Sequence, residues 1–466
     1  MLLISLKLFF AILIPTLVGA ALLKNIFTCT KLKRSVFLGF SYGLGQGILA
    51  QIILFIGALG GRFEVHTILK ALLIVGLVFY GKYYFGLKKN SFMPEENLLD
   101  ASTTETGVGA IFKGAVVLCF SLYVAMLFWK AWYWPIWGWD SMATSVFNAK
   151  VFFYEGSLEN LKYVPHAPFP LQIPFSILWL NLNLGQWHDE YIKIIFPLVF
   201  LSFAAIQHYF LKYYTNSFWA SLGLLFFLSA SLITTHATSS YRDLFLLYYN
   251  CSVLISLMLW HDSQDNAWLI LGGLLSGFGI FTKLEGLPYF LIHSLLLITC
   301  LFKQKKPLKV SILAFIKFTL PGLVIFLFFY MYKSLSGILM TEKTHMNFSG
   351  IFLDRVGWIL QRFLEDLFWT SNWSIIWFLL CFAILLHIRV IKNCFRLQFL
   401  LGALVLFFGV PFSTSLIVHD ASHILSRFTL SRIFLHFFPI SIWLIIFIYY
   451  RVITGSRQGL DCDSIA

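Results

Sequence analysis

Asp140 is the first residue of the sequence with a clear chemical use. It follows the aromatic stretch 131–139 and precedes a segment that ends at Gly156. Aspartate is common at the start of a helix and glycine just past its end, so the spacing predicts a short helix between the two. A carboxylate held in a partly dry cleft can also take a proton from a hydroxyl group. We therefore expect Asp140 to serve as a helix cap, as a general base, or as both.

Two charged pairs occur further along the chain. Arg242 and Asp243 stand at the start of an apolar run, and Lys283 and Glu285 lie between two closely spaced apolar runs. Charges between membrane spans cost free energy unless they line a wet cavity. We expect Asp243 to face the same cavity as Asp140. In that cavity, Lys283 would hold a phosphate and Glu285 would orient it or a sugar.

A proline-rich segment and a late arginine complete the set. The four prolines between residues 165 and 174 predict that this segment contains no regular helix. His166 in this segment has the chemistry to bind phosphate or to relay a proton. Arg432 precedes the last apolar run, and a guanidinium suits bidentate binding of phosphate. The alternatives are an ordinary surface histidine in a turn and an arginine that reaches lipid headgroups.

The composition decides what kind of protein contains these residues. Of 466 residues, 59% are hydrophobic and only 12% are charged, and the mean hydropathy is +0.81. A soluble domain carries about 25% charged residues. The chain cannot cover a water-facing surface, which excludes a soluble enzyme, a disordered chain and a nucleic-acid-binding protein. The net charge of +13 is explained by basic residues in cytoplasmic loops.

The apolar runs predict an all-α polytopic integral membrane protein with about 13 transmembrane helices (11–14). Basic residues concentrate in the short loops that are inside if the N-terminus is outside, so we predict that orientation. The first run is predicted to be an uncleaved helix rather than a signal peptide. The predicted runs lie near 2–23, 36–57, 67–86, 111–130, 191–211, 217–237, 240–260, 267–282, 285–301, 309–331, 374–392, 397–417 and 432–451.

Three parts follow from this pattern. Residues 1–109 form three N-terminal spans and a polar cytoplasmic linker. Residues 110–331 form a membrane core that includes the long outer segment 131–190. Residues 332–466 form a second outer segment and the C-terminal spans. The long outer segments predict juxtamembrane helices, since loops of that length are usually functional or disordered.

The second outer segment contains an amphipathic pattern at 356–369, which predicts a helix lying at the membrane surface. The polar face is predicted to contain Gln361, Arg362, Glu365 and Asp366. The seven cysteines show no spacing typical of a disulfide framework or of a zinc site. No cofactor is predicted; a divalent metal is possible, but no pattern indicates one.

Five short segments between about 110 and 440 together resemble the GT-C glycosyltransferases, which include protein O-mannosyltransferases and the lipid A aminoarabinose transferase. The first is Asp140 after an aromatic span end, with Glu155-Gly156 closing the helix. The others are Pro-His-Ala-Pro-Phe-Pro-Leu at 165–171, Tyr-Arg-Asp-Leu at 241–244, Thr-Lys-Leu-Glu-Gly at 282–286 and Arg-Ile-Phe-Leu-His-Phe-Phe-Pro at 432–439. The chain departs from the family where 165–171 lacks an aspartate, where 241–244 is not followed by its proline, and where three spans precede the first outer loop.

The resemblance implies an integral-membrane enzyme that moves a sugar from a polyprenyl-phosphate-linked donor to a glycan, lipid or protein acceptor. An acidic residue in the first outer loop would deprotonate the acceptor, and the sugar carbon would invert as the lipid phosphate leaves. The matching base is Asp140, and Arg432 and Lys283 match groups that steady the phosphate. Residues expected at the pocket are Asp243, Glu285, His166 and Arg242. Membrane lipids would surround the protein, and no nucleic acid is expected as a partner.

The apolar, phenylalanine-rich chain fits a bacterial inner membrane, with the endoplasmic reticulum membrane as the alternative. In the predicted orientation the candidate residues face the periplasm or outside. Two other functions remain open. An O-antigen-type polymerase or ligase would use arginine and histidine of the outer loops. A transporter or flippase would need polar residues at mid-span depth and broken helices in paired positions. The charged residues cluster instead at the outer ends of spans, which favours chemistry at the outer interface.

Overall fold

The computed structural model describes residues 2–28, 32–87, 107–164, 166–338 and 350–455. Within these ranges the chain forms 19 α-helices, which confirms the predicted all-α polytopic membrane fold. The predicted cytoplasmic linker at 90–109 lies almost wholly outside the described residues.

Ten helices in the described ranges are long and apolar enough to cross a membrane. They are α1 (Leu2–Ile26), α2 (Arg34–Ala58), α3 (Val65–Leu87), α4 (Gly107–Tyr133), α7 (Ile195–Tyr214), α10 (Asp243–Ser263), α12 (Gly286–Lys303), α13 (Leu308–Leu335), α17 (Phe395–Ile417) and α19 (Phe438–Gly455). An eleventh span results if α8 (Ser217–Ser229) and α9 (Ser231–Ala237) count as one helix broken by a 75° bend. The remaining two predicted runs correspond to the shorter apolar helices α11 (Asn266–Thr282) and α15 (Ile376–Leu386).

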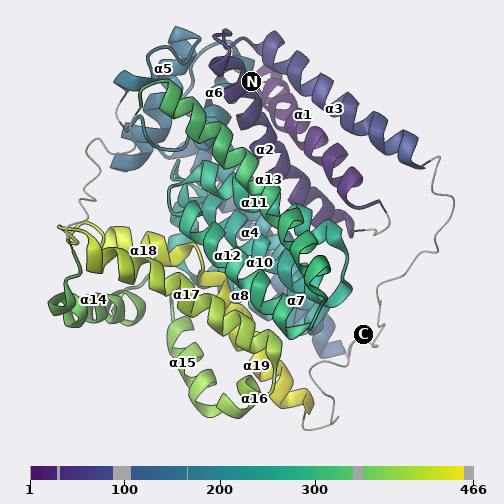
Figure 1. Cartoon of the computed structure of the whole chain (residues 1–466), viewed down its shortest axis with the longest axis vertical. Helices are drawn as coiled ribbons and strands as arrows, with labels where there is room; N and C mark the ends of the chain where they lie inside the picture. The colour runs from purple at the N-terminus through teal and green to yellow at the C-terminus, as the bar shows by residue number, and fades with distance from the viewer. Residues whose placement is uncertain (1, 29–31, 88–106, 165, 339–349, 456–466) are drawn as a thin grey trace.

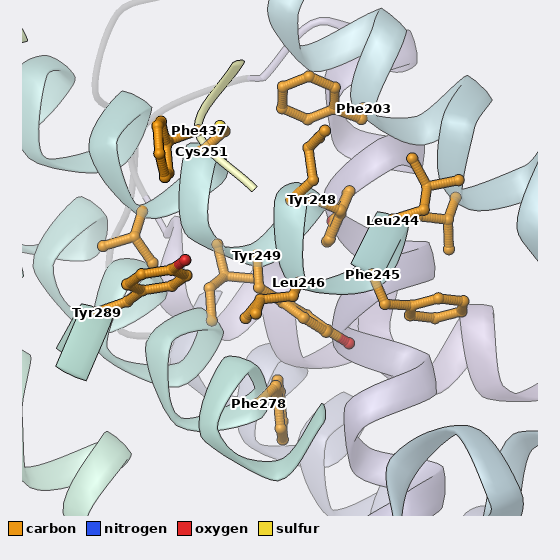
Figure 2. Close-up of a cluster of buried hydrophobic side chains, with 14 of the residues drawn as sticks. Phe203, Leu244, Phe245, Leu246, Tyr248, Tyr249, Cys251, Phe278, Tyr289 and Phe437 are labelled. Atoms are coloured by element: carbon orange, nitrogen blue, oxygen red, sulfur yellow. The ribbon is translucent and has the colours of Figure 1, made fainter. Parts of the chain in front are cut away.

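The first and the last helices of the chain lie on opposite sides of the molecule (Figure 1). Helices α1–α3 lie on one side, α14–α19 lie on the other, and α10–α13 lie between them. Helix α10 is the centre of the bundle, because nearly all its side chains from Asp243 to Trp260 are buried. Figure 2 shows the apolar cluster around it, which draws Phe203, Phe278 and Phe437 from other parts of the chain.

The N-terminal helices pack directly on this core. The hydroxyls of Tyr248 and Tyr249 on α10 donate to the carbonyls of Gly39 and Gly43 on α2, each at 2.9 Å. Helices α1 and α2 cross so closely that a Cβ atom at Gly45 would overlap the backbone of α1. Small residues allow such close helix packing inside a membrane.

The first segment predicted to lie outside, residues 131–190, is itself helical. It contains the π-helical turn η1 (Ser141–Val146), α5 (Phe147–Glu155), the 3₁₀ turn η2 (Leu161–Tyr163) and α6 (Gln172–Leu184), and the 3₁₀ turn η3 (Ile192–Ile194) leads into α7. The helix predicted before Gly156 is confirmed, and Gly156 ends it with a φ of 68°. The prediction of no helix up to residue 174 is wrong at its end, because Pro174 lies in the first turn of α6. A first-turn proline loses no hydrogen bond, since that N–H has no helical partner.

The second segment predicted to lie outside contains the turn η4 (Leu353–Arg355) and α14 (Val356–Trp369). The C-terminal part adds α16 (Ile388–Lys392) and α18 (Arg427–Leu435). The predicted amphipathic helix is confirmed as α14. The placement of Asp366 on its polar face is wrong, because Asp366 is fully buried with Ile359 and Phe363. Seven residues are close to two helical turns, so Ile359 and Asp366 share a face.

Candidate functional site

The predicted charged residues converge from four places in the chain. Asp140 precedes η1, Asp243 begins α10, Lys283 and Glu285 connect α11 to α12, and Arg432 lies in the last turn of α18. Helix α18 begins after Ser426, whose hydroxyl accepts a bond from the backbone N–H of Thr429. Further along this helix, Arg432 contacts Asp243 at the start of α10.

Asp243 is the centre of the cluster, and its side chain is fully buried. Its Oδ1 accepts hydrogen bonds from Lys283 Nζ and His436 Nε2, each at 2.9 Å. Its Oδ2 lies 3.0 Å from both Nε and Nη2 of Arg432. A buried carboxylate needs this number of donors to remain charged.

Arg432 joins Asp243 to Asp140. Its Nη1 donates to Asp140 Oδ2, and its guanidinium lies over the ring of Tyr241, 4.7 Å from the centroid. Burial alone would lower the pKa of Arg432, but Asp243 and Asp140 outweigh it and raise that pKa. Arg432 is therefore a permanent cation whose charge is shared between two carboxylates.

Asp140 is the accessible carboxylate of the pair. Its side chain is 42% exposed, whereas that of Asp243 is 0% exposed. Asp140 precedes η1 without capping it, because no side-chain hydrogen bond to the helix start is formed. The capping role considered from the sequence is thus absent, and the carboxylate is directed to Arg432 and to solvent.

Lys283 bridges two carboxylates. Its Nζ lies 2.9 Å from Asp243 Oδ1 and 2.7 Å from Glu285 Oε1. Burial opposes the charge on Glu285, yet the neighbouring ammonium group of Lys283 outweighs burial and lowers the pKa of that carboxyl. Glu285 is therefore ionised at neutral pH.

Arg242 is buried next to this network but keeps one donor group unused. Its Nε donates to Ser145 Oγ at 3.4 Å, and its guanidinium packs on Phe169 at 5.3 Å from the ring centroid. Its Nη2 makes no hydrogen bond within the described ranges. Burial lowers the pKa of Arg242 to about 10, so the group is still charged at neutral pH. An unpaired buried guanidinium nitrogen is costly unless an acceptor arrives.

Two histidines were missed from the sequence. His436 donates from Nε2 to Asp243, and its Nδ1 lies 3.0 Å from the hydroxyl of Tyr289, an arrangement that fits a neutral ring protonated on Nε2. Burial lowers the pKa of His436, which also favours the neutral form. His236 is buried, with Nδ1 3.8 Å from Asp243 Oδ2. The available signal was spacing, since His436 follows Arg432 by four residues.

His166 lies outside the ion-pair network. Its side chain is exposed, its φ is 57°, and its ring stacks on Phe169 at 4.9 Å. It reaches Arg242 only through Phe169. The proline-rich segment is fixed by the buried Lys333, which donates to the carbonyls of Pro168 and Phe169.

Within the described part of the chain, no group of three or more His, Cys, Asp or Glu residues is arranged to hold a metal ion. The charge of Asp243 is balanced by Arg432 and Lys283, and the neutral His436 adds a hydrogen bond.

Gly138 controls the approach to Asp140. Its φ is 91°, and a Cβ atom there would overlap the hydroxyl of Tyr241. With Asp140 as the base that the sequence predicts, we expect Gly138→Ala to displace Tyr241 or η1 and to lower the predicted rate of sugar transfer by at least about 10²-fold, because a displacement of about 1 Å at a catalytic group costs that much. Activity in membranes tests this, with Gly114→Ala as the control, since a Cβ atom at Gly114 meets open space. Equal activities of the two variants would contradict the expectation.

Asp366 links α14 to α18 beside the cluster. Its carboxylate accepts a hydrogen bond from Ser431 Oγ, next to Arg432, and one from Trp373 Nε1 at 3.3 Å. Burial raises the pKa of Asp366 to about 6. The neighbouring Asn372 donates to Ser431 Oγ at 2.9 Å.

This raised pKa predicts a pH dependence of stability. The folded state binds a proton more tightly than the unfolded state, so Asp366 contributes stability below about pH 4, and this contribution is lost as the pH rises to about 6. We expect the thermal midpoint of Asp366→Asn, compared with that of the wild type, to rise between pH 4.5 and pH 7.5. Scans of both proteins in detergent at the two pH values measure it. A constant difference between the two proteins would contradict the prediction.

No protein-family model, no curated protein and no solved structure matches this chain. The resemblance to GT-C glycosyltransferases therefore stays a prediction from the five sequence segments.

Proposed function

We propose that the chain is an integral-membrane glycosyltransferase that uses a polyprenyl-phosphate-linked sugar. The observation that carries the proposal is the contact of a half-exposed carboxylate, Asp140, with Arg432, which joins it to the buried charged cluster around Asp243. One group is placed to accept a proton, and the neighbouring groups are placed to stabilise negative charge. We propose the periplasmic face of a bacterial inner membrane as its location.

Asp140 has the properties of a general base. It is accessible to an acceptor hydroxyl, and its second oxygen is free of the Arg432 bond. Arg432 fixes the orientation of the carboxylate, and Arg432 also pairs with the buried carboxylate of Asp243. Such a base contributes about 10²- to 10⁴-fold to a reaction rate.

Arg242 is the strongest candidate to hold the donor phosphate. Arg432 is already occupied by two carboxylates, whereas Nη2 of the buried Arg242 lacks an acceptor. Arginine suits phosphate because its planar fork matches two phosphate oxygens. Lys283, at 15% exposure, would provide a second positive charge.

The proposed reaction is a single inverting displacement. The acceptor oxygen gives its proton to Asp140 and forms a bond to the anomeric carbon of the sugar. The bond from that carbon to the phosphate oxygen breaks on the opposite face, and its electron pair leaves with the lipid phosphate. Arg242 and Lys283 stabilise the charge that develops on the phosphate.

Lipid mass spectrometry tests the donor. The full chain is purified in detergent, incubated with a defined polyprenyl-phosphate-linked hexose and separated from free lipid. We expect the wild type to retain the donor and Arg242→Gln to retain at least about tenfold less, since a hydrogen bond to a charged group contributes about 1.5–3 kcal/mol.

Arg427→Gln is the matched control, because Arg427 lies on α18 and its side chain is 70% exposed. It should retain as much donor as the wild type. Retention of ordinary phospholipids alone by the wild type, with no bound donor, would contradict the proposal.

A further inference from the structure

The turn η1 separates the charged cluster from a hollow on its other side. Ser145 faces Arg242 and the charged cluster, whereas Met142 and Val146 face a hollow of about 510 Å³. This volume lies within the range of about 300–1,000 Å³ that is common for ligand pockets. The hollow is formed by the end of α4, the stretch that follows it, η1–α5 and the residues before η3.

Aromatic side chains line the hollow on the α4 side. Trp132, Tyr133 and Trp134 are 52%, 70% and 49% exposed. Only 11% of the apolar window of α4 is buried in the protein, so most of this helix faces lipid. Tryptophan and tyrosine at the end of such a span lie at the depth of lipid headgroups.

The opposite side of the hollow carries charges of both signs. Lys150 lies over the ring of Trp187 at 5.6 Å, and the indole N–H of Trp187 donates to Asp189 Oδ1 at 2.6 Å. Glu190 follows, and its side chain is 61% exposed. Trp187 thus holds the cation and the first carboxylate in fixed positions at the mouth of the hollow.

The stretch that follows α4 forms one wall of the hollow, and a buried lysine holds it in place. Lys193 is buried, and its Nζ donates to the carbonyl of Trp134 and, at 3.4 Å, to that of Pro135. Burying an ammonium group to hold a loop is costly, because the charge loses its hydration. The stretch after α4 is therefore a positioned wall.

We propose that this hollow binds the headgroup of a zwitterionic phospholipid. The ammonium group would lie between the aromatic side chains and the carboxylates of Asp189 and Glu190, since aromatic faces and carboxylates both attract cations. Lys150 would bind the phosphate, and the acyl chains would lie along α4. This site is separate from the proposed transfer reaction, because η1 lies between it and the charged cluster.

Charge favours this occupant over two others. An anionic headgroup would pair with Lys150 but would be repelled by the two carboxylates. A neutral sugar would stack on the aromatic rings but would leave Lys150 without an anion. A headgroup with one ammonium and one phosphate can pair with the carboxylates and with Lys150 at the same time.

Native mass spectrometry of the full chain tests the proposal. The protein is equilibrated with equal amounts of phosphatidylethanolamine, phosphatidylcholine and phosphatidylglycerol that have identical acyl chains. We expect the wild type to retain the two zwitterionic lipids at least about fivefold over phosphatidylglycerol. Glu190→Gln should lose this preference, because it removes a carboxylate that attracts the ammonium group and repels the anionic lipid, and one charged contact contributes about a factor of five or more. Lys150→Gln should instead retain at least about fivefold less of all three lipids, because Lys150 binds the phosphate that they share. Lys150→Arg should retain them as the wild type does.

Lys162→Gln and Glu159→Gln are matched controls, since both residues are exposed and lie outside the hollow. They should behave as the wild type. Equal retention of the three lipids by the wild type, an unchanged preference in Glu190→Gln, or undiminished retention by Lys150→Gln would overturn the proposal. A third result would also overturn it. If the wild type binds the soluble disaccharide chitobiose and both Lys150→Gln and Glu190→Gln abolish that binding, the hollow is a sugar site.

Discussion

Asp140→Asn is expected to lower the rate of sugar transfer by about 10²- to 10⁴-fold while the donor stays bound. Asparagine keeps the shape of the side chain and an oxygen that can accept the bond from Arg432, but it cannot take a proton from the acceptor. The loss should therefore appear in kcat and little in the KM for the donor. Initial rates with a radiolabelled donor in detergent measure both quantities.

Glu159→Gln is the control for this variant, because it removes an exposed carboxylate from the same outer segment. It should transfer sugar at the wild-type rate. The thermal midpoint of Asp140→Asn should also match the wild type, since Asp140 is half exposed and both charged partners of Asp243 remain. Undiminished transfer by Asp140→Asn would remove it as the base and favour a reaction that depends on arginine and histidine.

The positions of the spans along the sequence were predictable, because the length of each apolar run alone decides them. Each of the 13 predicted runs contains a helix, and the difference in count arises where a run is short or bent. The run at 217–237 bends by 75° after Ser229, and α11 has only 17 residues. Packing against neighbouring helices sets such bends and lengths, and the hydropathy of the sequence contains no information on this packing.

The convergence of the charged residues followed from topology. Asp140, Asp243, Lys283 and Arg432 were all predicted at the ends of spans on one side, and a bundle brings such ends together. Their pairing was not predictable. Arg432 is separated from Asp140 by 292 residues, and only the packed bundle decides that Arg432 is occupied while Arg242 keeps a free nitrogen.

His436 and Asp366 show the limits of sequence patterns in a different way. His436 lies in an apolar stretch where a histidine carries no distinctive context, and its role depends on Asp243, 193 residues away. Asp366 was grouped with polar neighbours because of its charge, although its spacing from Ile359 places it on the buried face. A buried carboxylate is acceptable there only because Ser431 and Trp373 donate to it.

Asp243→Asn is expected to cause the largest loss of stability of any single replacement in the site, about 3–5 kcal/mol. The carboxylate is fully buried and balances Arg432 and Lys283, while His436 donates to it. Asparagine removes the negative charge and places an NH₂ group against these donors. Thermal unfolding in detergent, together with the yield of monodisperse protein, measures the loss.

Glu285→Gln is the matched comparison for Asp243→Asn, because its side chain is 26% exposed and Lys283 Nζ is its ion-pair partner. Its effect should stay below about 1 kcal/mol, as for other partly exposed pairs. Adding Lys283→Met to Asp243→Asn should recover part of the lost stability, because it removes a cation that has lost its buried partner. Equal losses for the Asp243 and Glu285 variants, with no recovery in the double variant, would show that burial of charge does not hold this cluster together. Recovery would show that the cations surrounding Asp243 are tolerated only because of its carboxylate, and that the cluster which orients Asp140 depends on the charge of Asp243.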